Sequence, residues 1–317
     1  MDRANPILQR DAERIVSDVS GRDIRLAQAI LRGFMTFKYL VETVDQQRFI
    51  VRFYPPGRES VLNCEPDLLA HCRRAGVPVP VVVTDARTGP KATLAYVVYR
   101  VIEGTTLSEA LPHLTASQAQ VLASELATCL FELRKVELNG YGELITGDSA
   151  ADQSWRGFVK RSFESGIESL EQTRLIDSSS LLRLQQLVNT TRDDVDWQSC
   201  QLVWGDISFA NIIVNSSGHL AGLIDFESSL SGDPLATLGY CFACHGDHPF
   251  WETLVHHWPE TFDDAARERI LLYALLRGLR LAPYLDRPLP TGRPRDPLFE
   301  IFPGVELAIN RLTIPYT

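Results

Sequence analysis

The residues best suited to chemistry lie around residue 210 of the chain. Asp206 precedes Asn211 by five positions, and Asp225 follows Asn211 by fourteen, after a turn sequence at 215–218. A carboxylate on a loop can accept a proton from a substrate hydroxyl. Amide and carboxylate oxygens are the ligands that Mg²⁺ prefers. The plainer alternative is that Asp206 and Asn211 shape a turn and that Asp225 ends a strand.

The wider sequence resembles the aminoglycoside phosphotransferase family, the small-molecule branch of the protein-kinase-like fold. Residues 204–211 (WGDISFAN) are similar to the kinase catalytic loop, and residues 224–227 (IDFE) occupy the place of the metal-binding D-F-G sequence. A Gly-Asp-Pro sequence at 232–234 follows them. The combined spacing is specific, whereas each piece alone is weak.

The resemblance implies transfer of the γ-phosphoryl group of ATP or GTP to a hydroxyl of a small polar molecule. Asp206 would be the catalytic base, and Asn211 and Asp225 would hold Mg²⁺. In relatives that phosphorylate choline or methylthioribose, an Asp-x-Glu pair occupies the metal site. Glu227 is therefore a further candidate ligand.

The first part of the chain would supply the nucleotide site. Gly33 and Thr36 lie between two predicted strands, where the family places its phosphate-covering loop. Arg52 stands where kinases carry the lysine that reaches the α- and β-phosphates, and Glu65 is placed to pair with it. Val101 belongs to a segment that resembles the hinge, whose backbone reads the purine, so ATP and GTP are not distinguished. The alternative for the segment with Gly33 and Thr36 is a plain hairpin turn. The alternatives for Arg52 and Glu65 are a surface charge and a charge at the start of a helix.

Two positions depart from the family pattern. The usual His-Gly-Asp is Trp204-Gly205-Asp206, and Thr237 replaces a later aspartate. The histidine normally packs beneath the loop, so an aromatic residue could fill its space and activity is expected to be retained. The lost carboxylate keeps a nucleotide-binding pseudokinase open as an alternative.

Residues 241–245 (CFACH) match the attachment pattern of c-type haem. Haem attachment requires export, and the N-terminus lacks the apolar core of a signal peptide. Zinc would need a second cysteine pair. A helical turn with its cysteines packed inside is the favoured interpretation.

The periodicity of apolar residues predicts an α+β chain with a β-rich first part and a helical second part, and the family resemblance implies that these form a bilobal, protein-kinase-like fold. A leading helix at 5–20, a helix at 65–75 and five strands would form an N-terminal nucleotide-binding lobe, residues 1–104, with the strands at 27–31, 37–43, 48–54, 81–84 and 95–102. Helices would dominate a C-terminal catalytic and substrate-binding lobe, residues 105–317, at 117–134, 154–172, 178–195 and through 247–284. Short strands are expected there at 202–203, 212–214 and 220–224, and a loop at 288–297.

The composition is that of a globular protein, with 45% hydrophobic and 22% charged residues in 317. The net charge is −9, and it is uneven: residues 1–105 hold 15 basic and 12 acidic side chains, whereas residues 106–317 hold 16 and 28. This acidic part argues against nucleic-acid binding. No apolar run approaches the ~20 residues of a membrane span, and six scattered cysteines do not form a disulfide framework. A cytoplasmic location is expected, and the oligomeric state is not determined.

An acidic cleft would concentrate a cationic small molecule. Asp247, Trp251 and Glu252 belong to an aromatic and acidic cluster and are the predicted substrate residues. By resemblance and charge, an aminoglycoside or another antibiotic is the leading acceptor. A metabolic alcohol such as choline, homoserine or a sugar is the alternative acceptor. The alternative interpretation of the aromatic and acidic cluster is an exposed pair of helices with a few packed tryptophans.

Overall fold

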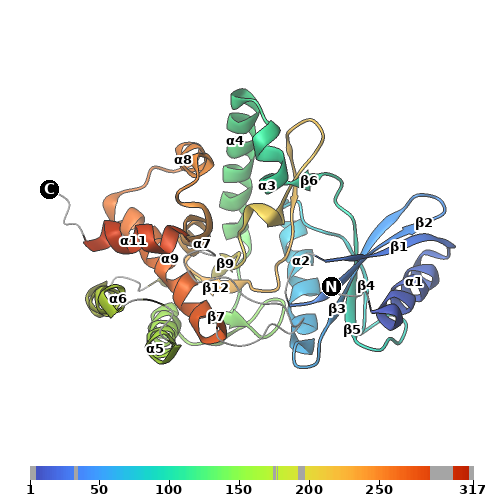
Figure 1. Ribbon diagram of the computed structural model, residues 1–317, viewed down its shortest axis with the longest axis horizontal. Helices are drawn as coiled ribbons and strands as arrows, with labels where there is room; N and C mark the ends of the chain where they lie inside the picture. The colour runs from blue at the N-terminus through green and yellow to red at the C-terminus, as the bar shows by residue number, and fades with distance from the viewer. Residues whose placement is uncertain are drawn as a thin grey trace.

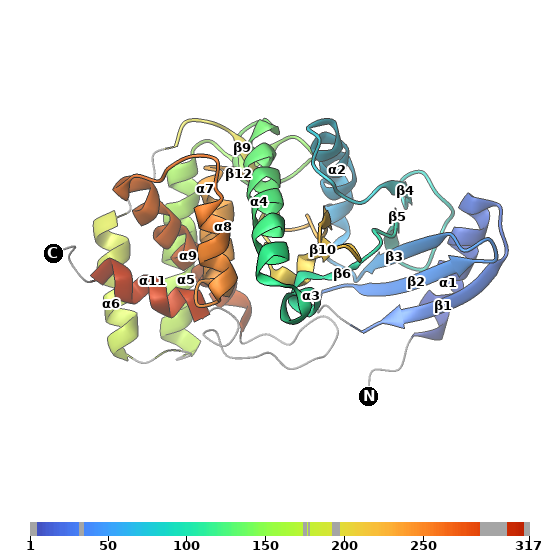
Figure 2. The same ribbon diagram turned by 90° about the horizontal axis from the view of Figure 1, so that it is seen from above.

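The computed structural model describes residues 5–31, 35–173, 176, 178–191, 197–285 and 303–313. It is an elongated α+β molecule, with a β-sheet at one end and a larger helical part at the other (Figure 1). Figure 2 shows that α2 and the strands β6 and β10 lie between these two parts. We call the two parts the small lobe and the large lobe. The predicted boundary at residue 104 stays a prediction.

The small lobe contains the antiparallel five-stranded sheet that the sequence predicts. Its strand order is β1-β2-β3-β5-β4, with bounds β1 Ile24–Ile30, β2 Phe37–Thr43, β3 Arg48–Tyr54, β4 Val82–Asp85 and β5 Ala95–Arg100. Helix α1 (Pro6–Ser20) packs on one face, and α2 (Glu65–Arg74) lies on the side of the large lobe (Figure 1). Helix α1 begins at the cap residue Asn5 and ends at Gly21, whose φ of 65° suits glycine.

Alternation along the strands decides which side chains face the large lobe. Val51 and Phe53 of β3 pack with α1 in one hydrophobic cluster. Arg52 lies between them in the sequence and therefore points to the opposite face, toward α2. Lys38 pairs directly with Arg52 across β2 and β3, so it shares that face.

Two short sheets form the joint between the lobes and the base of the large lobe. Strand β6 (Thr105–Thr106) pairs with β10 (Ile212–Val214), which pairs with β11 (Leu220–Leu223). The other sheet has the order β8-β7-β12-β9, with bounds β7 Tyr141–Leu144, β8 Ala150–Asp152, β9 Gln201–Val203 and β12 Leu230–Gly232. Strands β6, β7, β8 and β12 contain no two adjacent Val, Ile or Leu residues, and the sequence did not predict them.

The large lobe is built around α9 (Asp264–Leu285), whose middle is buried from Ile270 to Leu276. Helices α5, α7 and α11 pack against it. The helices of this lobe are α3 Leu107–Ala110, α4 Ala116–Glu132, α5 Trp155–Thr173, α6 Ser178–Thr191, α7 Leu235–His245, α8 Pro249–His256, α9 and α11 Pro303–Thr313. Short 3₁₀ turns occur at 59–63, 111–113, 133–135 and 209–211.

Several predicted boundaries are corrected. The returning helices were expected from 247, but α7 already begins at Leu235, directly after Gly-Asp-Pro. All residues of α7 from Ala236 to Ala243 are buried. A helix that is buried all round has no polar face to mark its period in the sequence. The predicted loop at 288–297 lies outside the described residues. Within the described ranges, no helix combines the length and apolarity that crossing a bilayer would require.

Candidate active site

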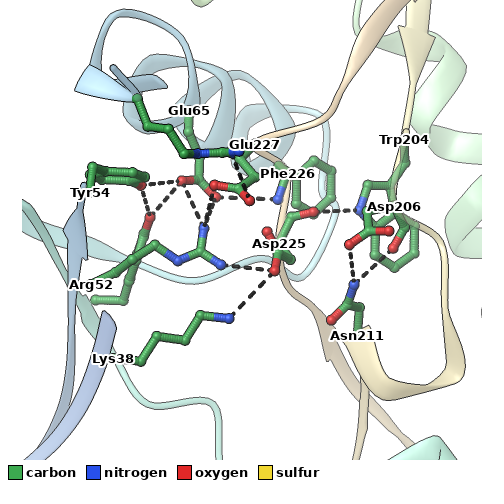
Figure 3. A network of polar contacts seen from close by, with 12 residues as sticks. Lys38, Arg52, Tyr54, Glu65, Trp204, Asp206, Asn211, Asp225, Phe226 and Glu227 are labelled. Atoms are coloured by element: carbon green, nitrogen blue, oxygen red, sulfur yellow. Dashed lines mark hydrogen bonds and ion pairs between the residues drawn. The ribbon is translucent and has the colours of Figure 1, made fainter. Parts of the chain in front are cut away.

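Asp206 and Asn211 lie on the loop between β9 and β10 and contact each other directly. The Asn211 side-chain nitrogen donates to the Asp206 carboxylate at 3.1 Å and to its backbone carbonyl at 2.8 Å. The amide nitrogen is thus occupied within the loop, which turns the Asn211 side-chain oxygen outward as a possible metal ligand (Figure 3). Gly205 is required here because a Cβ would lie 1.8 Å from the Ser228 carbonyl oxygen.

Asp225 has a backbone conformation that non-glycine residues seldom adopt, with φ of 67°. Its carbonyl oxygen accepts a hydrogen bond from the Trp204 indole N–H at 3.1 Å. The Trp204 ring, fully buried, also stacks on Phe226 at 5.3 Å and 12°. Trp204 therefore fixes Asp225 and Phe226 in the segment 224–227, which we call the metal loop after its predicted role.

The second departure from the family pattern lies directly beside the first. The Thr237 hydroxyl oxygen accepts the backbone N–H of Trp204 at 3.0 Å. Thr237 is 3% exposed, so its neutral hydroxyl supplies the acceptor that this buried N–H needs. The two residues that depart from the family pattern, Trp204 and Thr237, therefore bond to each other and hold the start of the catalytic loop. The predicted structural role of Trp204 is confirmed.

Arg52 is the centre of a buried charge network between the lobes. It is 5% exposed, and its guanidinium lies 2.9 Å from the Asp225 carboxylate, 3.3 Å from Glu65 and 3.7 Å from Glu227. The Lys38 ammonium lies 3.7 Å from the same Asp225 oxygen (Figure 3). The pairing of Arg52 with Glu65 is as the sequence predicted.

Glu65 connects α2 to strands β3 and β5 of the five-stranded sheet and to the metal loop. The hydroxyls of Tyr54 and Tyr99 each donate to one of its carboxylate oxygens at 2.8 Å. Its other oxygen accepts the backbone N–H of Phe226 at 3.3 Å. Because Phe226 follows Asp225, the position of α2 is coupled to the metal loop.

The charge network gives the three acidic residues different protonation behaviour. Burial raises the pKa of Asp225, but the charges of Arg52 and Lys38 outweigh it and lower this pKa to about 2. Burial raises the pKa of Asp206, opposed by Arg277. Burial and the Asp225 charge raise the pKa of Glu227 to about 7. Asp225 is thus ionised at neutral pH, as a metal ligand must be.

The residues present fit a magnesium ion. One carboxylate oxygen of Asp225, Oδ1, is buried and has no hydrogen-bond partner among the described residues. Together with the Asn211 oxygen it provides the two hard oxygen donors that Mg²⁺ takes from a protein when nucleotide phosphates supply others. The Glu227 carboxylate instead faces Arg58 at 3.1 Å and Arg52. Its role as a ligand remains a prediction.

The other predicted nucleotide residues are placed less completely. Gly33 lies outside the described residues, and Thr36 is buried just before β2. The Val101 backbone N–H donates to the Arg48 carbonyl at 3.1 Å, so that group is not available to a purine here. Backbone groups of neighbouring hinge residues would have to bind the purine.

The predicted substrate residues do not gather around one site. Trp251 is 5% exposed and packs edge-on against Phe242 at 5.3 Å, whereas Asp247 and Glu252 are exposed. The acidic and aromatic cluster itself divides: His245 and His248 line a pocket beside Phe209, and Trp258 and Glu260 line another. Neighbours in sequence lie apart here because α8 interrupts the segment.

Arg277 of α9 is the main functional residue that sequence analysis missed. Its guanidinium lies 2.5 Å from the Asp206 carboxylate, and its side chain is 8% exposed. The contact joins residues 71 positions apart, and no local pattern marks it. Lys38 could have been found, because strand register places it opposite Arg52.

The cysteine–histidine segment, residues 241–245, forms the C-terminal end of α7. Cys241 is fully buried in α7 and all six cysteines, each within the described ranges, are free. His245 Nε2 accepts the backbone N–H of Phe209 at 2.9 Å, so that nitrogen is occupied. Among the described residues, no three His, Cys, Asp or Glu side chains gather as a metal site. The favoured interpretation of a packed helical turn is confirmed.

Comparison with known families identifies this arrangement. Residues 27–286 match the model of the phosphotransferase enzyme family, which is most of the chain and includes Arg52, Asp206, Asn211 and Asp225. The chain belongs to this family. The resemblance stated from the sequence is thereby confirmed, and the protein is a small-molecule phosphotransferase.

Solved structures show the same fold at low sequence identity. A thermostable mutant of aminoglycoside phosphotransferase APH(4)-Ia, in ternary complex with ADP and hygromycin B, is 16% identical with a TM-score of 0.69, covering 95% of this chain and 96% of that one. A GDP complex of aminoglycoside 2'-phosphotransferase-IIIa is 19% identical, with a TM-score of 0.66 and 96% of each chain covered. A streptomycin–ATP complex of APH(2")-IIa is 16% identical, with a TM-score of 0.62 and 98% and 97% covered. No protein of curated function matches the chain in sequence.

Proposed function

We propose that this phosphotransferase moves the γ-phosphoryl group of ATP or GTP to a hydroxyl of a small molecule, with Asp206 as the base. The observation that carries the proposal is that Asp225, on the far side of the β10–β11 hairpin, lies beside the loop of Asp206 and Asn211. Phosphoryl transfer requires little covalent chemistry from the protein, which must position the reactants and neutralise charge.

In this mechanism the Asp206 carboxylate accepts a hydrogen bond from the acceptor hydroxyl and takes its proton as the oxygen attacks the phosphorus. Arg277 and Asn211 hold that carboxylate from two sides at 2.5 and 3.1 Å, which limits its rotation. Arg52 and Lys38 present two cations on the sheet face where the nucleotide phosphates would lie. Mg²⁺, held by Asn211 and Asp225, would supply neutralisation of charge on the phosphate oxygens.

The acceptor class predicted first from the sequence is an aminoglycoside or another hydroxylated antibiotic. Two of the similar structures contain hygromycin B or streptomycin, which makes aminoglycosides the first compounds to assay. A metabolic alcohol is the second class. The cytoplasmic location and the absence of a nucleic-acid partner remain predictions from the sequence.

The test is nucleotide consumption by the purified protein with Mg²⁺ and either ATP or GTP, across a panel of aminoglycosides, other hydroxylated antibiotics and metabolic alcohols. Asp206→Asn should lower acceptor-stimulated turnover by about 10²- to 10⁴-fold and leave nucleotide affinity within a few-fold. Asp148→Asn, which changes an exposed loop carboxylate, is the matched control.

Unchanged turnover in Asp206→Asn would refute Asp206 as the base. If the wild-type protein does not bind Mg²⁺–nucleotide, both the proposed function and the nucleotide-binding pseudokinase are refuted. Nucleotide binding without turnover on any acceptor would leave two accounts, an acceptor outside the panel or the nucleotide-binding pseudokinase.

A further inference from the structure

A pocket of about 400 Å³ opens next to the catalytic loop. Phe209, three residues after Asp206, forms part of its wall. The remaining wall comes from the start of the large lobe and from the α7–α8 corner, namely Ser108, Leu111, Pro112, His245 and His248. Because Phe209 and Asp206 share one short loop, a molecule in this pocket lies beside the reacting end of the site.

One side of the pocket wall is apolar and aromatic. The rings of Phe209 and His245 stack at 3.6 Å with an angle of 6° between them. Leu111 and Pro112 add aliphatic surface. None of the described residues that line the pocket is a carboxylate, in contrast to the acidic composition of this part of the chain.

Each imidazole of the pocket accepts a backbone hydrogen bond, and that of His245 is neutral. His245 Nε2 accepts the backbone N–H of Phe209, and burial together with His248 lowers the pKa of His245 to about 4. His248 Nδ1 accepts the N–H of Phe250 at 3.1 Å as the cap of α8. A nitrogen that accepts a hydrogen bond carries no proton, so each ring can donate only through its other nitrogen.

The reacting end of the site is also electrically balanced. The Arg277 guanidinium lies 2.5 Å from the Asp206 carboxylate and is packed over the Tyr240 ring at 5.5 Å. The base therefore forms part of a neutral pair, and a substrate ammonium near the reacting hydroxyl would approach a buried cation. Like charges a few ångströms apart repel strongly when solvent is excluded.

We propose that this pocket binds the acceptor, and that the acceptor is an uncharged molecule with an apolar group next to its hydroxyl. The inference rests on the proposed function and differs from the aminoglycoside class that net charge favoured. The apolar group would pack against Leu111, Pro112 and the stacked Phe209–His245 pair, and Ser108 and His248 would supply polar contacts. Asp247 and Glu252 are not among the described residues that line the pocket.

The test compares two probes by NMR of protein labelled in its histidine side chains. One is 2-phenylethanol, which is uncharged, aromatic and hydroxylated; the other is 2-deoxystreptamine, a hydroxylated ring with two ammonium groups. Ring signals of His248 are assigned with His248→Asn, because asparagine keeps a helix cap. Leu111→Glu adds a carboxylate to the pocket, and Val121→Glu adds one to the exposed face of α4 as the matched control.

We expect 2-phenylethanol to shift the His245 and His248 signals with millimolar affinity, as a fragment of this size allows. Leu111→Glu should weaken this binding at least tenfold, Val121→Glu should not change it, and 2-deoxystreptamine should leave both signals in place. Absence of 2-phenylethanol binding, or equal binding of the diamine, overturns the inference. Binding of Mg²⁺–ATP, measured on the same sample, distinguishes failure of this pocket from failure of the proposed function.

Discussion

Replacing Trp204 by phenylalanine tests how much the hydrogen bond from the Trp204 indole to the Asp225 carbonyl contributes to holding the metal loop. The smaller ring can still stack on Phe226, but it has no N–H for the Asp225 carbonyl, which now accepts a bond of 3.1 Å. Asp225 has φ of 67°, a conformation that costs of order 1–3 kcal/mol unless its surroundings enforce it. Without the bond, the backbone of Asp225 should relax and move its carboxylate.

The magnitude follows from the lost bond. A carbonyl left unsatisfied when its donor is removed costs about 1–2 kcal/mol for a partly buried group. If binding of Mg²⁺–nucleotide must restore the native loop, this cost is paid at each binding event. At 1.4 kcal/mol per tenfold change, the affinity of Trp204→Phe should fall about 5- to 30-fold.

The assay is titration of Mg²⁺–ATP into wild-type and variant protein, with unfolding by urea measured in parallel. Trp155→Phe is a matched control: Trp155 is also fully buried, and its indole donates to the Tyr273 hydroxyl at 3.0 Å, inside the large lobe. Both variants should lose stability, but only Trp204→Phe should lose nucleotide affinity. Equal affinities in the two variants would refute the reasoning.

Two further predictions concern stability. Arg52→Met leaves Glu65 and Asp225 buried without their cation and should lower the free energy of unfolding by about 3–5 kcal/mol. The control Arg100→Met, at an exposed position of β5, should lower it by less than about 1 kcal/mol. Equal urea midpoints for the two variants would contradict the charge network. His245 has a folded-state pKa of about 4, below the unfolded value of 6.5, so the unfolded state takes up the proton first as the pH falls. The stabilisation from neutral His245 is complete above pH 6.5 and is lost progressively toward pH 4, by about 2 kcal/mol between pH 7 and pH 5. His245→Gln should reduce the loss of stability over this interval, measured by urea unfolding at both pH values, and an unchanged pH dependence would show that His245 is not buried as a neutral ring.

The sequence predicted the small lobe well because its signals are local. Strands of seven residues alternate clearly, and this alternation alone assigns Arg52 to the face opposite α1. It missed β6, β7, β8 and β12, which contain no two adjacent Val, Ile or Leu residues. It also placed the returning helices from 247, although α7 begins at Leu235, where no polar face interrupts the apolar residues.

For the site, the sequence determined the chemistry of the loop. Asp206 and Asn211 are five residues apart and meet within one turn, so their spacing carries their geometry. The same is true of Asp225, which a short hairpin returns to the loop. Lys38 was within reach of the same reasoning through strand register.

Tertiary structure alone decided what surrounds those residues. Arg277 reaches Asp206 across 71 positions, and Thr237 accepts a bond from Trp204 across 33. The acidic composition of residues 106–317 indicated a cationic acceptor, yet packing turned Asp247 and Glu252 to the surface and placed Phe209 and His245 beside the base. Composition counts charges, whereas the folded chain decides which of them face a pocket, because that depends on contacts between distant segments that no local pattern encodes.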